Sequence, residues 1–204
     1  MSKHVQVIER ATMHDGYASV ERVTLRHRLF AGGWSEPVTR EVVRRGHAVG
    51  VLPYDPVRDE VVLIRQFRIG AWGDGRDPWL VETVAGIIDE GETAEQVARR
   101  ETLEECGCTL SDLHRVCDYL ASPGVMTERI SLFCGITESA GAGGIHGLGD
   151  EGEDIQAFAL SFDEVWADIQ AGRIIDAKVM LAMNWIGHNR ESLVSRFSRG
   201  KDRL

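Results

Sequence analysis

The 204-residue sequence has little positive charge, few cysteines and no long apolar run. Lysine and arginine number 23 against 32 aspartates and glutamates, giving a net charge of −9. This argues against a sequence-independent nucleic-acid binder, because such proteins need a basic footprint. No apolar stretch approaches the roughly 18 residues of a membrane span, and the N-terminus lacks the apolar segment of a signal peptide. We therefore expect a cytoplasmic protein with no nucleic-acid or membrane partner.

The cysteines do not indicate a disulfide framework, because there are only 4 of them in a chain of this length. Cys106 and Cys108 are separated by one residue, which is not the usual spacing of zinc ligands, and no second ligand pair accompanies them. We expect these two, together with Cys117 and Cys134, to be reduced thiols.

Short apolar and alternating runs predict a protein rich in strands. Strands are expected at 4–12, 17–30, 36–45, 47–53, 60–68, 80–85, 114–120, 129–137 and 155–160. Residues 72–78 and the glycine-rich tract 139–149 are expected to be loops, and helices are expected at 93–106, 162–171 and 177–190. The fold class is therefore α/β or α+β, a mixed sheet with a few helices. Residues 1–45 are the one plausible separate module, with 46–204 as the main domain.

The helix at 93–106 has the clearest boundaries of all these elements. Thr93 and Gln96 have the spacing of a capping box, and Gly107 stands where a C-cap glycine belongs. The apolar stripe of this helix continues into Glu101 and Glu105. The sequence thus places two carboxylates on the face that is expected to point inward.

Two interpretations of these carboxylates are open. Like charges four residues apart destabilise a helix by about 0.2–0.5 kcal/mol when exposed, and by more when desolvated. A hard divalent cation between them, Mg²⁺ or Mn²⁺, would remove that repulsion. The alternative is a solvated acidic face that is neutralised by Arg99 and Arg100.

The sequence around this helix resembles the Nudix box, a loop–helix–loop with fixed spacing of glycine, arginine and glutamate. The matching residues are Gly86, Glu92, Arg100, Glu101, Glu104, Glu105 and Gly107. The sequence departs from the box at two aliphatic positions, where Thr102 and Cys108 stand, but both side chains are small enough to pack. The resemblance implies a Nudix hydrolase, with an α/β/α sandwich, a mixed sheet and an N-terminal antiparallel β subdomain.

The resemblance also implies a metal site. In Nudix hydrolases the residues that match Glu101 and Glu105 ligate Mg²⁺, with Mn²⁺ as a possible substitute. Arg100 is expected to orient the carboxylates, Glu104 to assist, and the carbonyl of Ala85 to be a further ligand, although Glu104 by itself could be a surface residue. Such ions would let a protein of net charge −9 bind an anionic diphosphate, because they bridge carboxylate and phosphate oxygens.

Outside the box, the chain resembles bacterial ADP-ribose pyrophosphatases over most of its length. The segments that carry this resemblance are 26–30, 45–48, 53–59, 78–80, 120–124 and 144–154. Pro123 stands downstream of the box at the place associated with ADP-ribose preference. The implied reaction is hydrolysis of ADP-ribose to AMP and ribose 5-phosphate, by a homodimer whose N-terminal strands cross over.

The resemblance assigns further roles to single residues. Glu151 would be the general base and Glu153 a further metal ligand; the alternative is an acidic turn that keeps a mobile loop soluble. Arg68 would hold substrate phosphate, although a solvated strand end also explains it. Tyr17 would stack on adenine or simply pack in its strand. The remaining implied substrate contacts are Arg40 and Glu41, which would reach the partner's site, and Arg45, Ile87, Ser122, Pro123, Gly124 and Glu128.

Two alternative functions remain. The same chemistry could act on another nucleoside diphosphate sugar, such as GDP-mannose or ADP-glucose, because the residues that bind the sugar cannot be identified from the sequence. A degenerate domain could only sense ADP-ribose, but it should have lost box carboxylates, which this chain retains. The glycine-rich tract lacks the Gly-Lys-Ser/Thr ending of a P-loop, and no nucleophile pattern surrounds His27, His47 and His146, which we expect to be structural or loop residues.

Overall fold

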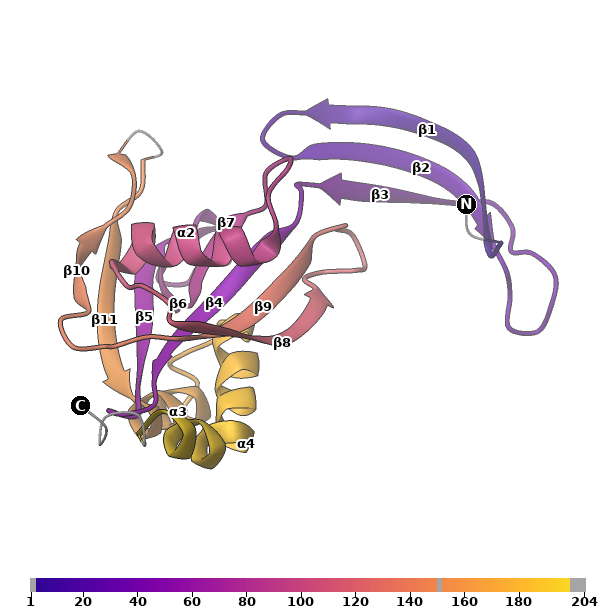
Figure 1. Ribbon diagram of the computed structural model, residues 1–204. Coiled ribbons are helices and arrows are strands. Elements are labelled where there is room, and N and C mark those ends of the chain that lie inside the picture. The colour runs from indigo at the N-terminus through magenta and orange to yellow at the C-terminus, as the bar shows by residue number, and fades with distance from the viewer. Residues whose placement is uncertain (1–2, 150–151, 199–204) are drawn as a thin grey trace. The chain divides into compact units, whose positions relative to one another are not determined.

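The computed structural model describes residues 3–149 and 152–198, and the chain divides into two compact units (Figure 1). Unit 1 consists of residues 1–47 and 119–130, and unit 2 of residues 48–118 and 131–204. In the part of the chain that is described, no helix has the length and apolar character needed to cross a membrane.

Unit 1 is built on an antiparallel sheet of three strands. They are β1 (Val5–Asp15), β2 (Ser19–His27) and β3 (Val38–Arg44), in that order. All of β1 is exposed, and the apolar residue in this sheet that is fully buried is Val23 of β2. The turn 122–126 joins the same unit, because the N–H of Val43 donates to the carbonyl of Val125 at 2.8 Å.

Unit 2 contains an eight-stranded sheet. Six strands run in the order β10 (Gly143–His146), β11 (Ile155–Ser161), β5 (Glu60–Phe67), β4 (Ala48–Asp55), β9 (Arg129–Ile136) and β8 (Asp112–Leu120). In addition, β6 (Trp79–Glu82) pairs with β5, and β7 (Val84–Ile87) pairs with β4. The helices are α1 (Ile69–Gly73), α2 (Ala94–Cys106), α3 (Phe162–Gln170) and α4 (Ala177–Ser198).

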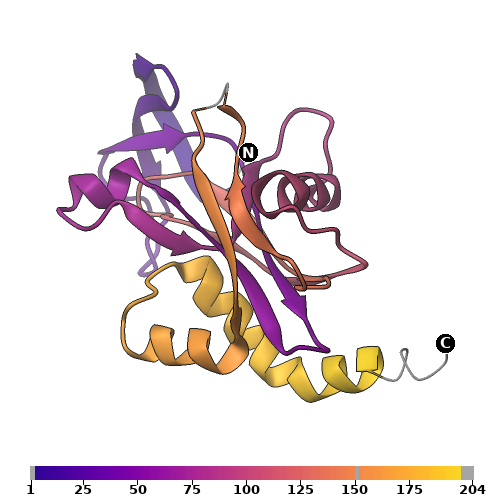
Figure 2. The ribbon, with the colours of Figure 1, turned by 90° about the vertical axis from the view of Figure 1, so that its left-hand side faces the viewer.

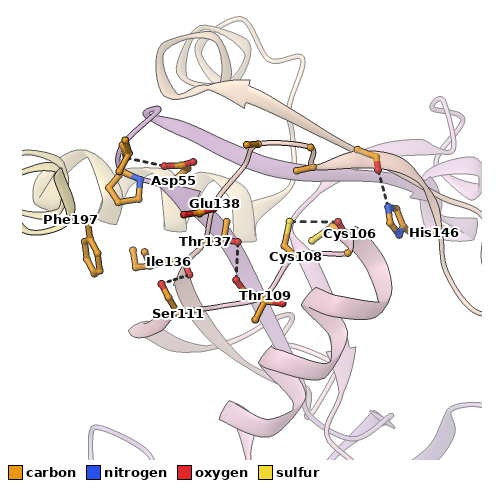
Figure 3. A pocket seen from close by; sticks show the side chains of 17 residues that line it. Asp55, Cys106, Cys108, Thr109, Ser111, Ile136, Thr137, Glu138, His146 and Phe197 are labelled. Atoms are coloured by element: carbon orange, nitrogen blue, oxygen red, sulfur yellow. Dashed lines mark hydrogen bonds between the residues drawn. The ribbon is translucent and has the colours of Figure 1, made fainter. Parts of the chain in front are cut away.

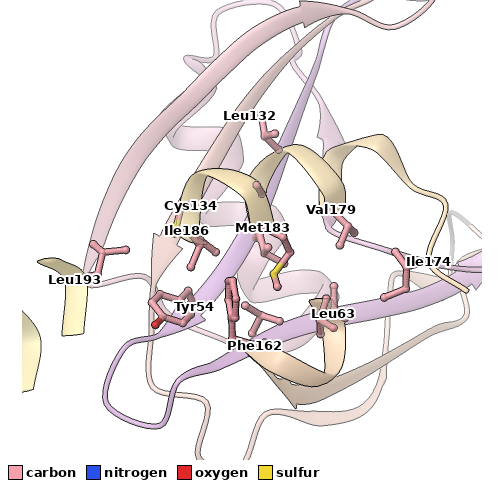
Figure 4. Packing of buried hydrophobic residues seen from close by; sticks show 14 of the residues in the cluster. Tyr54, Leu63, Leu132, Cys134, Phe162, Ile174, Val179, Met183, Ile186 and Leu193 are labelled. Carbon is pink, nitrogen blue, oxygen red and sulfur yellow. The ribbon is translucent and has the colours of Figure 1, made fainter. Parts of the chain in front are cut away.

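The helices of unit 2 cover both faces of its sheet, with α2 on one face and α3 and α4 on the other (Figure 2). Val97 and Ala98 of α2 pack on Val62 and Ile64 of β5. On the opposite face, α3 and α4 pack on a second cluster that includes Leu63 (Figure 4). β4 and β5 are nearly continuous apolar runs, because a strand covered on both faces has no side that must be polar. This layered arrangement confirms the expected fold class.

Most expected strands and helices are present with ends shifted by a few residues, and α4 continues to Ser198 instead of ending at 190. Three further expectations were wrong. Residues 80–85 do not form one strand, because the chain changes partner at Thr83, from β5 before it to β4 after it. The glycine-rich tract 139–149 is not all loop, since β10 pairs antiparallel with β11 inside it. The expected loop 72–78 overlaps the end of the short helix α1.

Candidate active site

The boundaries of helix α2 follow from local hydrogen bonds. The N–H of Gln96 donates to Oγ1 of Thr93 at 3.3 Å, and the N–H of Thr93 donates to Oε1 of Gln96 at 2.8 Å. At the other end, Gly107 has φ 68° and donates its N–H to the carbonyl of Leu103 at 3.0 Å. The capping box and the C-cap glycine predicted for this helix are therefore both confirmed.

Glu105 lies on the buried side of α2 and has only 2% of its surface exposed. Its Oε2 accepts a hydrogen bond of 2.9 Å from the N–H of Ala85, which fixes the last turn of the helix against β7. The apolar stripe of the helix thus continues into a buried carboxylate, as the sequence predicted.

The surroundings of Glu101 and Glu105 disfavour the charged form of both carboxylates. Burial raises the pKa of Glu105 to about 8; the Ala85 N–H opposes this, and the negative charges of Glu101 and Glu153 add to it. Burial likewise raises the pKa of Glu101 to about 7, against the opposing charge of Arg100. The charge of Glu153 acts on both groups, so this residue of the β10–β11 connection faces the same place.

Arg100 holds three carboxylates together. Its Nη1 donates to Glu101 at 2.9 Å and to Glu104 at 3.0 Å, and its Nε and Nη2 each donate to Glu92 at 3.3 Å. Arg99 instead donates to the carbonyl of Leu110 at 2.6 Å. The interpretation as a solvated face neutralised by both arginines therefore holds for Glu104 at most, and the buried Glu105 contradicts it.

Gly86 allows this arrangement because it has no side chain. A Cβ atom at this position would come within 1.8 Å of Oε1 of Glu101. Any other residue would therefore displace the carboxylate, and the glycine of the box is explained by close approach rather than by a left-handed φ.

The residues at this place fit a divalent cation. All the candidate donors are hard oxygens, from Glu101, Glu104, Glu105, Glu153 and the carbonyl of Ala85. Two of the carboxylates have raised pKa values because burial and mutual repulsion are not balanced by positive charge. Over residues 3–149 and 152–198, no three His, Cys, Asp or Glu side chains lie in a group that could hold a metal ion as they stand; Glu101 and Glu104 are instead hydrogen-bonded to Arg100. A cation would supply the missing positive charge.

Arg68 lies at the end of β5 and is tied to Glu82 of β6. Its Nε and Nη2 donate to the same oxygen of Glu82, at 3.0 and 2.7 Å, and its guanidinium also feels the charge of Glu105. Glu82 has 4% of its surface exposed, and Lys178 of α4 lies 3.9 Å from it. Arg68 is therefore not a freely solvated strand end.

Sequence reasoning missed Glu82 and Lys178. The available signal for Glu82 was an isolated acidic residue inside the apolar run 79–85, which needs a cation when it is buried. No local pattern could have pointed to Lys178, because it follows Glu82 by almost a hundred positions and joins it only in the fold.

In unit 1, the structure brings Tyr17, Arg45 and Glu128 together. Nη2 of Arg45 donates to the hydroxyl of Tyr17 at 2.5 Å, and the guanidinium carbon lies 4.9 Å from the centroid of the tyrosine ring. Nη1 of Arg45 lies 3.9 Å from Oε1 of Glu128, while the buried Nε of Arg45 has no hydrogen-bond partner among the described residues. An unpartnered donor of this kind can bind a ligand without breaking an existing bond.

The other candidates of unit 1 lie on β3 and on the turn 122–126. Arg40 donates to the carbonyl of Thr39 at 2.8 Å, and Glu41 forms an ion pair of 3.8 Å with Arg22. The carbonyl of Ser122 accepts hydrogen bonds from the N–H groups of Val125 and Met126, at 3.1 and 2.8 Å, so that Pro123 and Gly124 lie inside a tight turn.

The remaining candidates lie on unit 2. Ile87 ends β7 directly after Gly86 and is 36% exposed. Oε2 of Glu153 accepts the N–H of Leu148 at 3.2 Å. Glu151, the expected base, lies outside the described residues.

Comparison with known proteins identifies the family. The profile of the NUDIX domain matches residues 44–182, more than half of the chain. This chain is a member of the Nudix family. ADP-ribose pyrophosphatase of Escherichia coli K12 is 43% identical over 194 residues, covering 95% of this chain and 93% of that protein. The ADP-ribose pyrophosphatase of Haemophilus influenzae is 37% identical over 198 residues, covering 96% and 91%.

Two further matches to this Nudix protein have lower sequence identity and are not named ADP-ribose pyrophosphatase. A GDP-mannose pyrophosphatase of Salmonella arizonae is 31% identical over 200 residues, covering 91% of this chain and 96% of that protein. The crystal structure of an ADP compounds hydrolase matches with a TM-score of 0.66 and 20% identity, covering 92% and 97%. At this identity the structural match supports the fold alone, and it agrees with the Nudix sandwich described above.

The positions where this Nudix box departs from the usual aliphatic residues are well packed. Oγ1 of Thr102 donates to the carbonyl of Ala98 at 2.6 Å and is fully buried. Cys108 is buried, as is Cys106. The three histidines singled out from the sequence each use a ring nitrogen to bond backbone, which suits a structural role; they are His27, His47 and His146.

Proposed function

We propose that this Nudix protein hydrolyses ADP-ribose to AMP and ribose 5-phosphate in a reaction that requires a divalent cation. The observation that carries the proposal is the carboxylate of Glu105, which is buried to 2% exposure near Glu101 and keeps a raised pKa of about 8 despite the charge of Arg68. Similarity at 43% and 37% identity, over almost the whole chain, to two ADP-ribose pyrophosphatases supports the substrate.

We propose that Mg²⁺, with Mn²⁺ as a substitute, is held by oxygens of Glu101, Glu105, Glu104, Glu153 and the carbonyl of Ala85. A bound cation would polarise the phosphoryl oxygens and lower the pKa of a water molecule. Arg100 keeps Glu101 and Glu104 in place through the hydrogen bonds of its Nη1. Arg68, oriented by Glu82, would bind a phosphate oxygen through the donors that Glu82 leaves free.

Unit 1 would recognise the nucleoside. The unpartnered Nε of Arg45, the ring of Tyr17 and the backbone of Ser122 to Gly124 offer a donor, a stacking surface and acceptors for adenosine. In this proposal Glu128 holds Arg45 in place, and Ile87 contacts the substrate from β7. Arg40 and Glu41 would extend into the active site of the partner subunit. The protein would act as a cytoplasmic homodimer, with residues 1–45 for dimerisation and 46–204 for hydrolysis.

A substrate panel tests the proposed specificity. With excess Mg²⁺, kcat/KM for ADP-ribose should exceed that for GDP-mannose and ADP-glucose, with AMP as a product. Comparable values for GDP-mannose would favour the broader nucleoside diphosphate sugar hydrolase, which the 31% identical relative makes the second candidate. Tight binding of ADP-ribose without AMP release would instead identify a sensor.

The role of Glu151 as the general base is a separate proposal with its own test. Glu151→Gln should lower kcat while leaving Mn²⁺ binding close to that of the wild type. Glu153→Gln is the matched variant, since loss of a metal ligand should weaken Mn²⁺ binding. If Glu151→Gln keeps wild-type turnover, another carboxylate is the base.

A further inference from the structure

Cys106 and Cys108 lie at a cavity that the proposed hydrolysis does not use (Figure 3). The cavity has a volume of about 690 Å³ and lies entirely within unit 2. Its walls come from the C-terminal end of α2, the turn after β4, the end of β9, the glycine-rich tract and the end of α4. Small molecules in solvent therefore have a space beside the two thiols.

The backbone brings the two thiols together. Gly107, between them, has a left-handed φ of 68°, so the chain reverses direction just after the helix. Sγ of Cys108 donates to the carbonyl oxygen of Cys106 at 3.6 Å, and the two thiols are close enough for each to perturb the pKa of the other. Sγ of Cys106 also donates to the carbonyl of Thr102 at 3.0 Å.

The other cysteines provide a contrast. Cys134 is completely buried in the cluster under α3 and α4, and Cys117 lies half-buried on β8. Neither of them lines the cavity. Cys106 and Cys108 therefore differ from them in having both a neighbouring thiol and an opening beside it.

We propose that Cys106 and Cys108 form a reversible dithiol–disulfide site that is oxidised by a hydroperoxide entering this cavity. The thiolate of Cys108 attacks one peroxide oxygen, the O–O bond breaks, and an alcohol or water leaves as a sulfenic acid forms. The sulfur of Cys106 then attacks the sulfenic sulfur, the S–S bond forms and water leaves. Two electrons and two protons pass from the thiols to the peroxide, so the step is balanced.

The resulting disulfide would be easily reduced. A bond between residues separated by one glycine closes a very small loop, so it gains little from restricting the unfolded chain. Small, strained disulfides have high reduction potentials and are typically labile. These properties suit a disulfide that is repeatedly formed and reduced rather than a structural cross-link.

Formation of the disulfide would also affect the position of the carboxylates on α2. It would remove the thiol donor of Cys106 from the carbonyl of Thr102 and fix the C-cap of the helix. Glu105 precedes Cys106, and its carboxylate depends on the position of this turn to accept the N–H of Ala85. Oxidation should therefore weaken divalent-cation binding several-fold, and reduction should restore it.

Peptide mapping of the full chain tests the site. The reduced, metal-free protein is treated with hydrogen peroxide, blocked with an alkylating agent and digested with trypsin. Residues 101–115 form one tryptic peptide, which contains Cys106 and Cys108 and neither other cysteine. This peptide should lose the mass of two hydrogen atoms and escape alkylation, and dithiothreitol should reverse both changes.

Variants separate the site from general thiol oxidation. Cys117→Ser should behave as the wild type in every measurement. Cys108→Val, which places an aliphatic residue at that box position, should form no disulfide and should keep the same Mn²⁺ affinity before and after peroxide. Cys108→Ser is a second variant if valine disturbs folding.

Three results would overturn the proposal. They are an unchanged peptide, oxidation of one of the two sulfurs to the sulfinic acid while the other stays reduced, and a disulfide between two chains on a non-reducing gel. A disulfide within the peptide with unaltered Mn²⁺ affinity would refute the coupling to α2. Because the readouts are mass and metal affinity, they do not depend on the substrate being ADP-ribose.

Discussion

Glu105 is the residue at which burial and charge conflict most strongly. Glu105→Gln keeps the size of the side chain but removes its charge, so we expect nearly complete loss of hydrolysis. The loss should exceed the roughly 10–100-fold that removal of a hydrogen-bonding partner of a metal ligand costs. Activity measured across Mg²⁺ concentrations checks this. Glu95→Gln, an exposed change in the first turn of the same helix, should have almost no effect, and equal effects of the two variants would refute the assignment.

The raised pKa of Glu105 predicts how the stability of the metal-free protein depends on pH. The carboxyl has an ordinary pKa of 4.5 when unfolded and about 8 when folded, so the folded state binds the proton more tightly. Its contribution to stability is complete below the unfolded pKa and is lost as pH rises toward 8.

Urea unfolding in the presence of a chelator measures this pH dependence. Between about pH 5 and 8 the free energy of unfolding should fall more steeply in the wild type than in Glu105→Gln, which has no carboxyl there to titrate. Saturating Mg²⁺ should reduce the difference, because the cation stabilises the charged form. Parallel curves for the two metal-free proteins would show that Glu105 does not titrate as described.

Substitution of Gly86 should lower the activity without unfolding the protein. In Gly86→Ala the new Cβ would meet Oε1 of Glu101 at 1.8 Å, so the carboxylate must move away. We expect hydrolysis to fall by roughly 10–100-fold, the usual cost of disturbing a metal ligand. Gly73→Ala is the control, because a Cβ there has no neighbour within 4 Å. Wild-type activity in Gly86→Ala would mean that Glu101 need not hold its position.

At the scale of secondary-structure elements, what the sequence predicts depends on where the determining interactions lie. Helix α2 was predicted almost to its ends because Thr93, Gln96 and Gly107 act within one turn of the residues they cap. By contrast, the chain pairs with β5 before Thr83 and with β4 after it. This change depends on distant strands, so no local sequence pattern predicts it. The strand β10 could not be predicted for the same reason: its glycines favour a loop by composition, but pairing with β11 decides their structure.

The same distinction applies to the candidate site. The carboxylates and Arg100 follow one another on a single helix, so fixed spacing was enough to find them. The contact of Arg68 with Glu82, and that of Arg45 with Tyr17, join residues from different strands or turns. Single positions could be proposed from family resemblance, but their partners could be identified only from the fold.

The capping boxes of α2 and α3 allow a prediction in which loss of one N-cap is compared with loss of the other. Thr93 caps α2 and Ser161 caps α3, each through the same reciprocal pair of hydrogen bonds. Thr93→Ala and Ser161→Ala should each lower the free energy of unfolding by about 1 kcal/mol. Only Thr93→Ala should also lower Mn²⁺ affinity, because α2 carries the carboxylates. Unfolding curves and metal titrations of the two variants check this, and an equal loss of Mn²⁺ affinity in both would contradict it.

At the scale of the whole molecule, the sheet of unit 1 buries few apolar side chains. All of β1 is exposed, including Val5, Val7, Ile8 and Met13, which are 39%, 46%, 56% and 48% exposed. Small sheets need a covered apolar face to be stable, and contiguous exposed apolar residues typically mark an interface. A second copy of the chain would cover these residues, which supports the proposed homodimer.

Light scattering coupled to size-exclusion chromatography should therefore give twice the mass of the 22.6 kDa chain. Ile8→Lys places a charge on the exposed face of β1 and should shift the protein toward the monomer, with a lower melting temperature. Leu181→Lys is the matched control, because Leu181 is 40% exposed on α4, within unit 2. It should leave the mass unchanged. A monomeric wild type, or a dimer that tolerates Ile8→Lys as well as it tolerates Leu181→Lys, would show that β1 does not form the interface.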